Sequence, residues 1–244
     1  MNLPVVNDQP PAPKTHTPET IELIDIWDTF QGEGPFVGLP ATFVRLAHCN
    51  LKCPQCDTNY TDGVLTMPVE DVVTKVIKMW PQASRDAWRK EWWERKLVVL
   101  TGGEPFRQDI STLAHLLVRS SFHVQIETNG TLFCEDLPWY GALTVVCSPK
   151  TRQIDNRLKP HVHALKYVLH ADHVSPDDGL PTRVLGAPVA PCRPWEGFRG
   201  ELFVNPEDSG DEDQNRRNLD AAMYVCRRYG YRLGIQLHKY IGVK

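Results

Sequence analysis

Short runs of β-branched and other apolar residues alternate along this chain with longer segments in which apolar residues recur every three or four positions. The short runs are typical of buried strands, and the longer segments are typical of helices with one buried face. Their alternation predicts an α/β fold built on a mostly parallel sheet. Strands are expected at residues 21–27, 41–47, 97–101, 123–127, 143–147, 163–169, 201–204 and 232–236, and helices at residues 69–80, 110–119 and 213–229.

The number of predicted strands bears on how the sheet closes. About six to eight strands are too few for a full eightfold barrel of strand–helix units, so we expect an incomplete TIM-type β/α barrel. Residues 21–244 are predicted to form this single domain. Residues 1–20 contain five prolines and little apolar surface, which is typical of a flexible N-terminal arm.

Two segments interrupt the alternation of strands and helices. Residues 82–96 (QASRDAWRKEWWERK) hold three of the seven tryptophans and are expected to form a helical insertion. Either these tryptophans pack on the body of the domain, or they form a contact surface for a second subunit or an electron donor. Residues 171–200 hold five prolines and are expected to form a long surface loop or flap.

Composition and charge place the chain among ordinary globular proteins. Of its 244 residues, 41% are hydrophobic and 23% are charged, and the formal net charge is −3. No basic face indicates direct nucleic-acid binding, no apolar run is long enough to span a membrane, and the first residues lack the pattern of a signal peptide. We therefore expect a cytoplasmic protein, in which clustered cysteines are ligands or catalysts rather than disulfide partners.

Polar residues that a strand core does not need follow five of the predicted strands. In a parallel sheet the carboxyl ends of the strands share one edge, where the connecting loops build active sites. The five segments are Arg45 with the cysteine-rich loop after it, TGGEP at 101–105, ETNG at 127–130, CSPK at 147–150 and VNPE at 204–207.

Three cysteines, Cys49, Cys53 and Cys56, fall within the eight positions of CNLKCPQC. A structural zinc site usually takes two spaced pairs of ligands, and adjacent residues such as His48 and Cys49 rarely reach one tetrahedral centre. Iron–sulfur clusters are held by thiolates on short loops. Three thiolates on a four-iron cluster would leave one iron free for a substrate or cofactor, and we favour this interpretation over zinc. The remaining cysteines have apolar neighbours and are expected to be buried without a chemical role: Cys134, Cys147, Cys192 and Cys226.

Arg45 stands in a predicted strand whose two faces are both largely apolar. It shares one face with Phe43 and Ala47, because side chains alternate along a strand. A charged group in such surroundings needs a counter-ion, and the planar guanidinium suits a carboxylate. The counter-ion is either a ligand carboxylate or an internal acidic side chain.

At this point the motifs show a resemblance to known proteins. CNLKCPQC resembles the CxxxCxxC motif of the radical S-adenosylmethionine (SAM) superfamily, and GGEP resembles its glycine-rich segment. More narrowly, QGEGPFVGLPATFVRLAHCNLKCPQCDT, TGGEP, ETNG, SPK and the terminal IQLHKYIGVK resemble the 7-carboxy-7-deazaguanine synthase family, over about residues 22–244.

This resemblance implies a radical SAM domain and a defined reaction. Members convert 6-carboxy-5,6,7,8-tetrahydropterin to 7-carboxy-7-deazaguanine with loss of ammonia, in the biosynthesis of queuosine and related 7-deazaguanines. They use a [4Fe–4S] cluster, SAM and Mg²⁺. The family also implies a homodimer and an electron donor such as a flavodoxin.

The resemblance further implies roles for residues that match the family's motifs. Cys49, Cys53 and Cys56 would bind the cluster, and the Thr58 hydroxyl would contact Mg²⁺. The chain end, including His238 and Lys239, would fold back over the substrate. SAM would contact Gln55, Asp57, Gly103, Glu104, Ser148, Pro149, Lys150 and Asn205, and the pterin would contact Phe30, Gln31, Gly32, Glu33, Arg45, Thr101 and Lys244.

The chain departs from the family's pattern at four of these places. His48 replaces a common glycine, Gln55 an aromatic residue, Asn205 a glutamine, and Lys244 a short apolar residue. Two other functions stay open: an activating enzyme that places a glycyl radical on a partner protein, and a catalytically silent regulatory relative. The first would not need QGEG, Arg45 or the HKY segment, and the second would have no reason to keep the cysteines.

Overall fold

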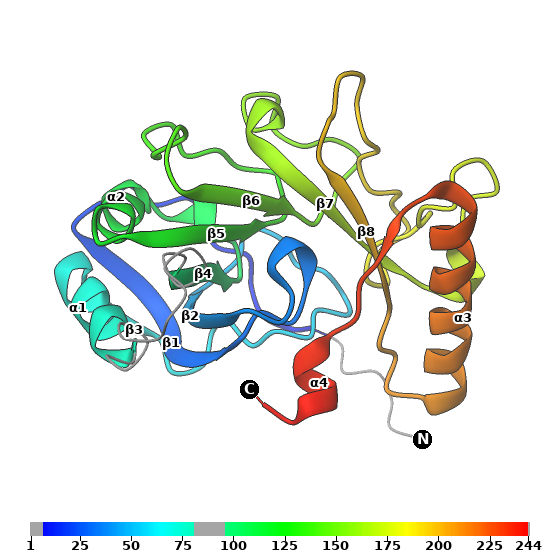
Figure 1. The fold of residues 1–244 in the computed structure, drawn as a ribbon, viewed down its shortest axis with the longest axis horizontal. Helices are drawn as coiled ribbons and strands as arrows, with labels where there is room; N and C mark the ends of the chain where they lie inside the picture. Colours follow the sequence, from blue (N-terminus) through cyan, green and yellow to red (C-terminus); the bar gives the residue numbers. More distant parts are fainter. Residues whose placement is uncertain (1–6, 81–95, 244) are drawn as a thin grey trace, which may run out of the picture.

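A curved sheet forms the centre of the protein, which is described here by a computed structural model over residues 7–80 and 96–243 (Figure 1). Within these residues the sheet has nine strands in the order β3-β1-β2-β4-β5-β6-β7-β8-β9. Their bounds are β1 Thr20–Phe30, β2 Pro40–Leu46, β3 Leu65–Pro68, β4 Lys96–Gly102, β5 Phe122–Thr128, β6 Leu143–Cys147, β7 Val162–Leu169, β8 Glu201–Pro206 and β9 Arg232–Leu233.

The strand order explains why the sheet curls. From β2 through β4 to β9, neighbouring strands are parallel and follow one another in chain order. Right-handed crossovers that always advance in one direction place their helices on one face, and the sheet curves around the other. β1 and β3 extend the sheet beyond β2 by antiparallel pairing. Because β3 and β9 are the two edges, the barrel stays open, and the predicted partial barrel is confirmed.

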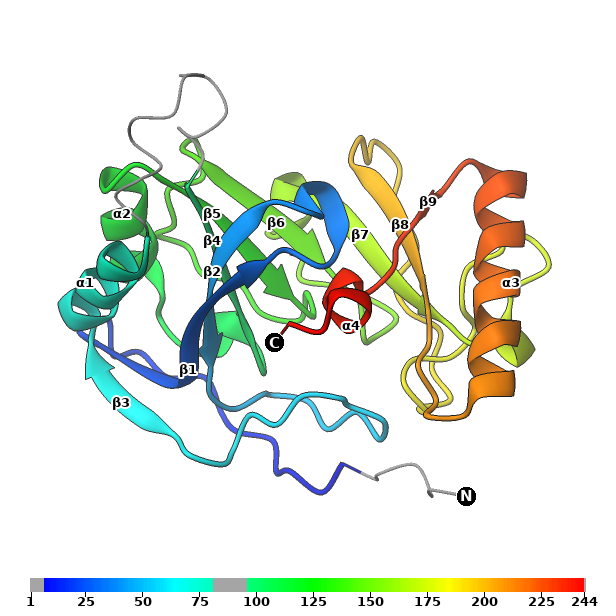
Figure 2. The ribbon, with the colours of Figure 1, turned by 60° about the horizontal axis from the view of Figure 1, so that its bottom comes forward.

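Of the four helices in the described residues, three cover the outer face of the sheet and one short helix lies on its inner side (Figure 2). The apolar positions of the first helix, Val69, Val72, Val73 and Val76, have helical spacing and are all buried against the sheet. No helix in the described residues is both long and apolar enough to cross a membrane. The helices are α1 Val69–Met79, α2 Ser111–Arg119, α3 Glu212–Tyr229 and α4 Leu237–Ile241, with 3-10 turns at Gly34–Phe36, Pro105–Arg107, Lys159–His161 and Ala171–His173.

The predicted elements are found with small shifts at their ends, except near the carboxyl terminus. The strand expected at 232–236 shortens to β9, Arg232–Leu233, and α4 follows it. A five-residue helix is too short to show a period in the sequence. β3, a short edge strand with Leu65 52% exposed, was also missed. The tryptophan-rich insertion falls almost wholly outside the described residues, and its last residue, Lys96, begins β4.

Alternation along each strand divides the side chains between an outer core and an inner face. In β4, Val98 and Leu100 point outward into the main core, whereas Leu97 and Val99 point inward into a smaller apolar cluster. The next inward residue, Thr101, is polar and lies at the strand's carboxyl end. The inner face is therefore apolar at the start of this strand and polar where it ends.

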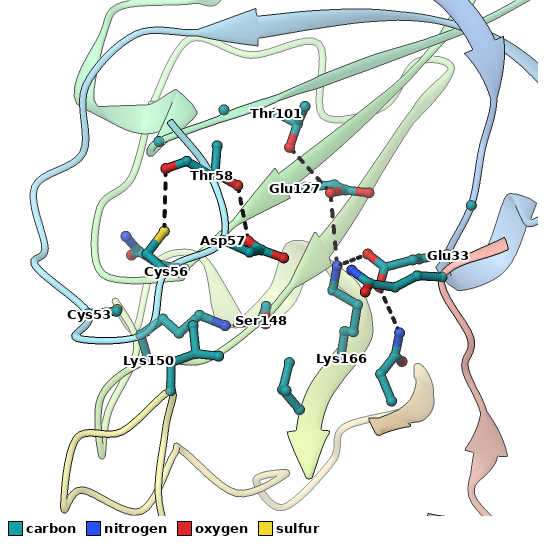
Figure 3. Close-up of a pocket in the computed structure, with 18 of the residues that line it drawn as sticks. Glu33, Cys53, Cys56, Asp57, Thr58, Thr101, Glu127, Ser148, Lys150 and Lys166 are labelled. Atoms are coloured by element: carbon teal, nitrogen blue, oxygen red, sulfur yellow. Dashed lines mark hydrogen bonds and ion pairs between the residues drawn. The ribbon is translucent and has the colours of Figure 1, made fainter. Parts of the chain in front are cut away.

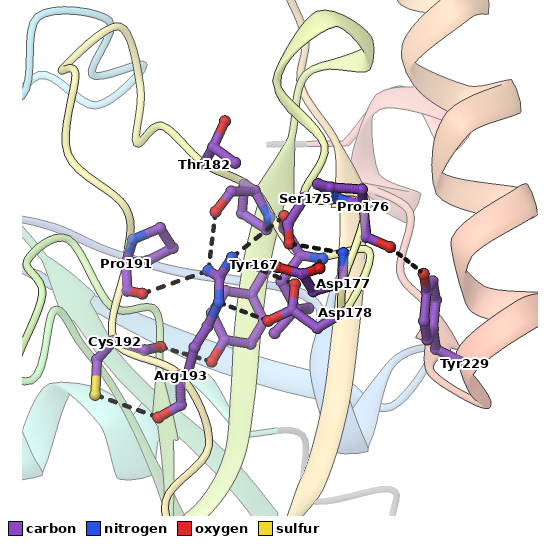
Figure 4. Close-up of polar contacts among 12 residues, drawn as sticks. Tyr167, Ser175, Pro176, Asp177, Asp178, Thr182, Pro191, Cys192, Arg193 and Tyr229 are labelled. Atoms are coloured by element: carbon purple, nitrogen blue, oxygen red, sulfur yellow. Dashed lines mark hydrogen bonds and ion pairs between the residues drawn. The ribbon is translucent and has the colours of Figure 1, made fainter.

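The proline-rich connection between β7 and β8 has its own polar core (Figure 4). Arg193 Nε lies 2.8 Å from an Asp178 carboxylate oxygen, and its Nη1 donates to the Pro181 carbonyl at 2.9 Å. Tyr167 of β7 donates its hydroxyl to the Cys192 carbonyl at 2.7 Å. These contacts attach the connection to the barrel wall.

The same connection reaches the cysteine-rich loop. A backbone bridge between Val184 and Ala187 forms a turn with Leu185 at its tip. The backbone amide of Gln55 donates to the Leu185 carbonyl at 3.0 Å. Leu185 consequently forms part of the cavity described below, and the segment expected as a surface loop contributes to the site.

Candidate active site

A cavity of about 480 Å³ lies where the parallel strands end. All five of the predicted polar segments reach it, and so do His238 and Lys239 from the carboxyl-terminal region. The roles expected for these residues stay predictions, but the structure brings them together. The predicted residues that line the cavity are Gln31, Gly32, Glu33, Arg45, Cys49, Cys53, Gln55, Cys56, Asp57, Thr58, Thr101, Gly103, Ser148, Lys150 and Asn205.

Three other predicted residues do not reach the cavity wall, and a fourth falls outside the described residues. Phe30 is 42% exposed, whereas its neighbour Gln31 is 1% exposed and lines the cavity. Consecutive side chains of an extended segment point to opposite sides, so only one of the two faces inward. Pro149 is buried away from the cavity, and Lys244 is not among the described residues. Glu104 is the third residue that does not reach the cavity wall.

Glu104 was expected to contact SAM, but its side chain is fully buried behind the cavity wall. Its carboxylate accepts hydrogen bonds from the Thr128 hydroxyl at 2.7 Å and from the backbone amides of Asn129 at 2.7 Å and Phe106 at 3.0 Å. Burial raises the pKa of Glu104 to about 7, against the opposing effect of these hydrogen bonds. Glu104 thus joins TGGEP to ETNG and has no free approach to a ligand.

Gly103 is required by a close backbone approach. A Cβ at this position would lie 1.8 Å from the His48 carbonyl oxygen, which accepts a hydrogen bond from the Glu104 amide at 3.0 Å. Any side chain would displace the residues just before the first cysteine. This glycine therefore positions the cysteine-rich loop from the end of the neighbouring strand.

His48 adopts a backbone φ of 63°, in the left-handed region that favours glycine. A residue with a Cβ pays about 1 kcal/mol or more in this conformation. We expect His48→Gly to raise the free energy of unfolding by about 1 kcal/mol in urea denaturation, because the strain is removed. His48→Ala, which keeps the Cβ but loses the imidazole, is the matched control and should not be stabilised. A less stable glycine variant would contradict the assignment.

The three thiols of the cysteine-rich loop all line the cavity and form no disulfide. Cys49 is buried, Cys53 and Cys56 are half-buried, and Cys49 Sγ accepts a weak hydrogen bond from the Leu51 amide at 3.4 Å. Burial raises the pKa of Cys49 to about 12, and it also raises the pKa values of Cys53 and Cys56. The thiols are therefore neutral near pH 7, and metal binding must remove their protons.

The placement of these thiols suits an iron–sulfur cluster. Within residues 7–80 and 96–243, no three His, Cys, Asp or Glu side chains gather around one possible ion position. The thiolates of an iron–sulfur cluster bind different irons. Such ligands must line one cavity without meeting at one point, as Cys49, Cys53 and Cys56 do.

Two polar pairs lie beside the thiols (Figure 3). The Thr58 hydroxyl donates to the Asp57 carboxylate at 3.2 Å, and both residues line the cavity. These are hard oxygen donors of the kind that Mg²⁺ takes together with water and ligand oxygens. The Lys150 ammonium donates to the Ser148 hydroxyl at 2.6 Å, and burial lowers the pKa of Lys150.

Arg45 has an unused donor in the cavity wall. Its Nε is buried and has no hydrogen-bond partner among the described residues, and its guanidinium carbon lies 4.9 Å from the centre of the Trp27 ring. Burial lowers the pKa of Arg45, while the carboxylates of Asp57, Asp25 and Glu127 oppose that shift. The Arg45 side chain lines the cavity, where its planar guanidinium fits an incoming carboxylate.

A buried ion-pair cluster also lines the cavity, around Lys166 of β7 (Figure 3). The Lys166 ammonium lies 2.6 Å from one Glu33 carboxylate oxygen and 4.0 Å from Glu127, and the three side chains are between 12% and 17% exposed. Asn205 donates to the other oxygen of Glu33 at 2.8 Å. Burial alone would lower the pKa of Lys166, but the two carboxylates outweigh it and raise that pKa.

Lys166 had no predicted role, although the sequence contains a signal for it. It interrupts the apolar strand HALKYVL, and it shares the inner face with Ala164 and Val168. The same reasoning that singled out Arg45 applies to it. Glu127 was noticed as part of ETNG, but only the fold brings its carboxylate to Lys166, Thr101 and Gln31.

An open partial barrel with free thiols on the loop after its first parallel strand defines the class of the protein: it is a radical SAM enzyme. The comparisons with known proteins narrow this class. The sequence is 38% identical over 237 residues to the 7-carboxy-7-deazaguanine synthase of Rhodospirillum rubrum, covering 92% of this chain and 93% of that protein. The corresponding protein of Escherichia coli K12 is 35% identical over 240 residues, covering 90% and 97%. The chain belongs to the 7-carboxy-7-deazaguanine synthase family.

A comparison with solved structures supports the same fold. The crystal structure of QueE from Escherichia coli superposes with a TM-score of 0.61 and 23% identity, covering 90% of this chain and 95% of that one. The scan against protein-family profiles finds no match. Membership of this family implies radical SAM cofactors and a small pterin as the substrate.

Proposed function

We propose that this protein is a carbon–nitrogen lyase that converts 6-carboxy-5,6,7,8-tetrahydropterin to 7-carboxy-7-deazaguanine with loss of ammonia, in 7-deazaguanine biosynthesis. One observation carries the proposal. One part of the wall of a single cavity has three free thiols. Another part has Arg45, which can bind a carboxylate, and the ion-pair cluster of Glu33, Lys166 and Glu127.

The cofactors follow from the donor groups. Cys49, Cys53 and Cys56 would hold a [4Fe–4S] cluster, and Thr58 with Asp57 would hold Mg²⁺. When bound, the cluster and SAM, with one electron from a reductant, would supply radical chemistry that abstracts a hydrogen atom from the pterin. SAM would contact residues of the cysteine-rich loop and of three strand ends: Gln55, Asp57, Gly103, Ser148, Lys150 and Asn205.

The chain's own residues would bind and orient the pterin. Arg45, whose side chain lines the cavity, would offer its guanidinium to the substrate carboxylate. Glu33, whose carboxylate is already held by Lys166 and Asn205, keeps lone pairs that can accept the N–H groups of the pterin's guanidine-like edge. The raised pKa of Lys166 keeps its ammonium charged, so two acidic side chains can stay close together in the cavity wall.

Partners and location follow from the family. We infer a homodimer that acts in the cytoplasm with an electron donor such as a flavodoxin. The alternative of an activating enzyme that places a glycyl radical on a protein does not explain the buried Glu33–Lys166 pair. The alternative of a silent regulatory relative does not explain three free thiols in one cavity.

The deciding experiment is anaerobic. The purified chain is reconstituted with iron and sulfide and then incubated with SAM, Mg²⁺, a reductant and 6-carboxy-5,6,7,8-tetrahydropterin. The expected result is a cluster absorbance and formation of 7-carboxy-7-deazaguanine, measured by mass spectrometry. A loaded cluster that cleaves SAM without forming this product would favour the activating enzyme. A chain that takes up no iron would favour the regulatory relative.

Arg45→Ala is expected to weaken pterin binding by about 10- to 100-fold, because charge-assisted hydrogen bonds contribute about 1.5–3 kcal/mol. Iron content and reductive SAM cleavage should be unchanged, because Arg45 is not a ligand of the cluster. The change is measured as an increase in KM for the pterin. Arg45→Lys retains the charge but loses the planar fork, so it should recover only part of the affinity. Normal substrate affinity in the alanine variant would contradict the carboxylate assignment.

A further inference from the structure

The N-terminal segment lies along the cysteine-rich loop (Figure 2). The backbone amide of Asn7 donates to the Pro54 carbonyl at 2.8 Å, and the backbone amide of Ala12 donates to the Cys49 carbonyl at 2.7 Å. The two segments therefore run in opposite directions, and contacts at both ends hold them together.

Two side chains of the arm add further contacts to the loop. Asn7 is only 5% exposed, and its Nδ2 donates to the Cys53 carbonyl at 3.0 Å and to the Tyr60 hydroxyl at 3.2 Å. Gln9 Nε2 donates to the Thr58 carbonyl at 2.9 Å, and its Oε1 accepts from the Tyr60 amide at 2.7 Å. The arm thereby reaches two of the three cysteines with its own backbone or side-chain donors, and it also reaches the predicted magnesium ligand.

The loop needs such donors because it has no regular structure of its own. Residues 47–59 form neither helix nor strand, so their carbonyl groups lack the partners that a ladder would supply. The arm satisfies four of these carbonyls, those of Cys49, Cys53, Pro54 and Thr58. Each contact restricts the backbone that carries a thiol or a hydroxyl toward the cavity.

We propose that Asn7 and Gln9 are positioning residues: they strap the cysteine-rich loop in place and so determine how firmly the chain retains its iron–sulfur cluster. The cluster part of this inference rests on the proposed function, whereas the restraint on the loop does not. The strap acts through the carbonyls of the loop, so neither residue is required to touch the cluster, SAM or the pterin.

The first measurement is hydrogen exchange on the full-length chain without cluster. In Asn7→Ala, the loop amides between residues 48 and 60 are expected to exchange about tenfold faster, which is the factor for loss of one or two ordinary hydrogen bonds. The amides of β4 and β5 should keep their protection, which shows that the variant is folded. Asp8→Ala is the matched control, because Asp8 is the exposed neighbour of Asn7. Gln9→Ala should resemble Asn7→Ala.

The second measurement is iron retention after anaerobic reconstitution. A chelator should remove iron from Asn7→Ala about tenfold faster than from the wild-type chain or Asp8→Ala, because the loop opens more often. This readout does not depend on turnover.

The outcomes separate the strap from the function. Wild-type exchange and wild-type iron release in both Asn7→Ala and Gln9→Ala would overturn the proposal that these two residues restrain the cysteine-rich loop. Faster exchange with unchanged iron release would overturn its link to the cluster. If the wild-type chain takes up no iron, the proposed function and the cluster part of this inference both fall, and the exchange result still decides whether the arm restrains the loop.

Discussion

Cys53→Ala is expected to abolish both cluster loading and turnover while leaving the protein folded. Cys53 is half-buried and lines the cavity, and with it removed only two thiols are left in the cysteine-rich loop. Two thiolates cannot hold a cluster that depends on three corners. Iron per chain, visible absorbance and product formation should all fall to background in the same anaerobic preparation, whereas the circular dichroism spectrum should be unchanged.

The control for this variant is another cysteine of the same chain. Cys226 is 7% exposed and packs from the buried face of α3 into the main core, outside the cavity. Cys226→Ala should bind iron like the wild type and lose only about 1 kcal/mol of unfolding free energy, as is typical of a small core truncation. Wild-type iron content in Cys53→Ala, or loss of iron in Cys226→Ala, would contradict the assignment of the thiols.

Lys166→Met is expected to impair both stability and substrate binding. The substitution leaves Glu33 and Glu127 close together in the cavity wall without their shared cation. Removing one partner of a buried ion pair costs about 3–5 kcal/mol of unfolding free energy. Because Glu33 is no longer held in place, KM for the pterin should rise as well. Denaturant unfolding of the cluster-free chain and steady-state kinetics of the loaded enzyme measure the two effects separately.

Two controls test whether the Lys166 charge is the cause. Lys166→Arg keeps a cation and should recover a large part of the stability. Lys75→Met makes the same change at an exposed position of α1 and should alter stability by less than about 0.5 kcal/mol. If Lys166→Met is as stable as Lys75→Met and has the KM of the wild type, the ion-pair cluster has no role in positioning Glu33.

Much of the fold could be predicted because its signals are local. The alternation of short apolar runs with helical periods identified seven of the nine described strands, β1, β2 and β4 to β8, close to their observed ends. The elements that were missed or overextended, β3, β9 and α4, have two to five residues each. Segments this short owe their conformation to their neighbours, so their own sequence carries little information.

The site shows the same division. Arg45 could be predicted because a charge in an apolar strand is unusual wherever the strand lies, and the cysteine spacing is visible in eight letters of sequence. The direction of the Glu104 side chain could not be predicted, because it depends on the end of a neighbouring strand, where Thr128 and Asn129 supply the donors that hold it away from the cavity. The same local pattern, a carboxylate after two glycines, is compatible with either direction.

By itself, the sequence determined the class of fold, the edge of the sheet where the chemistry gathers, and the residues able to bind a cluster. These depend on hydrophobic period and residue type, which are properties of short segments. Only the tertiary structure decided that Lys166 meets Glu33, which lies 133 residues away, and that the arm at Asn7 holds the Cys53 carbonyl. Such contacts depend on the curl of the sheet and on the path of irregular segments, and no local pattern specifies either of them.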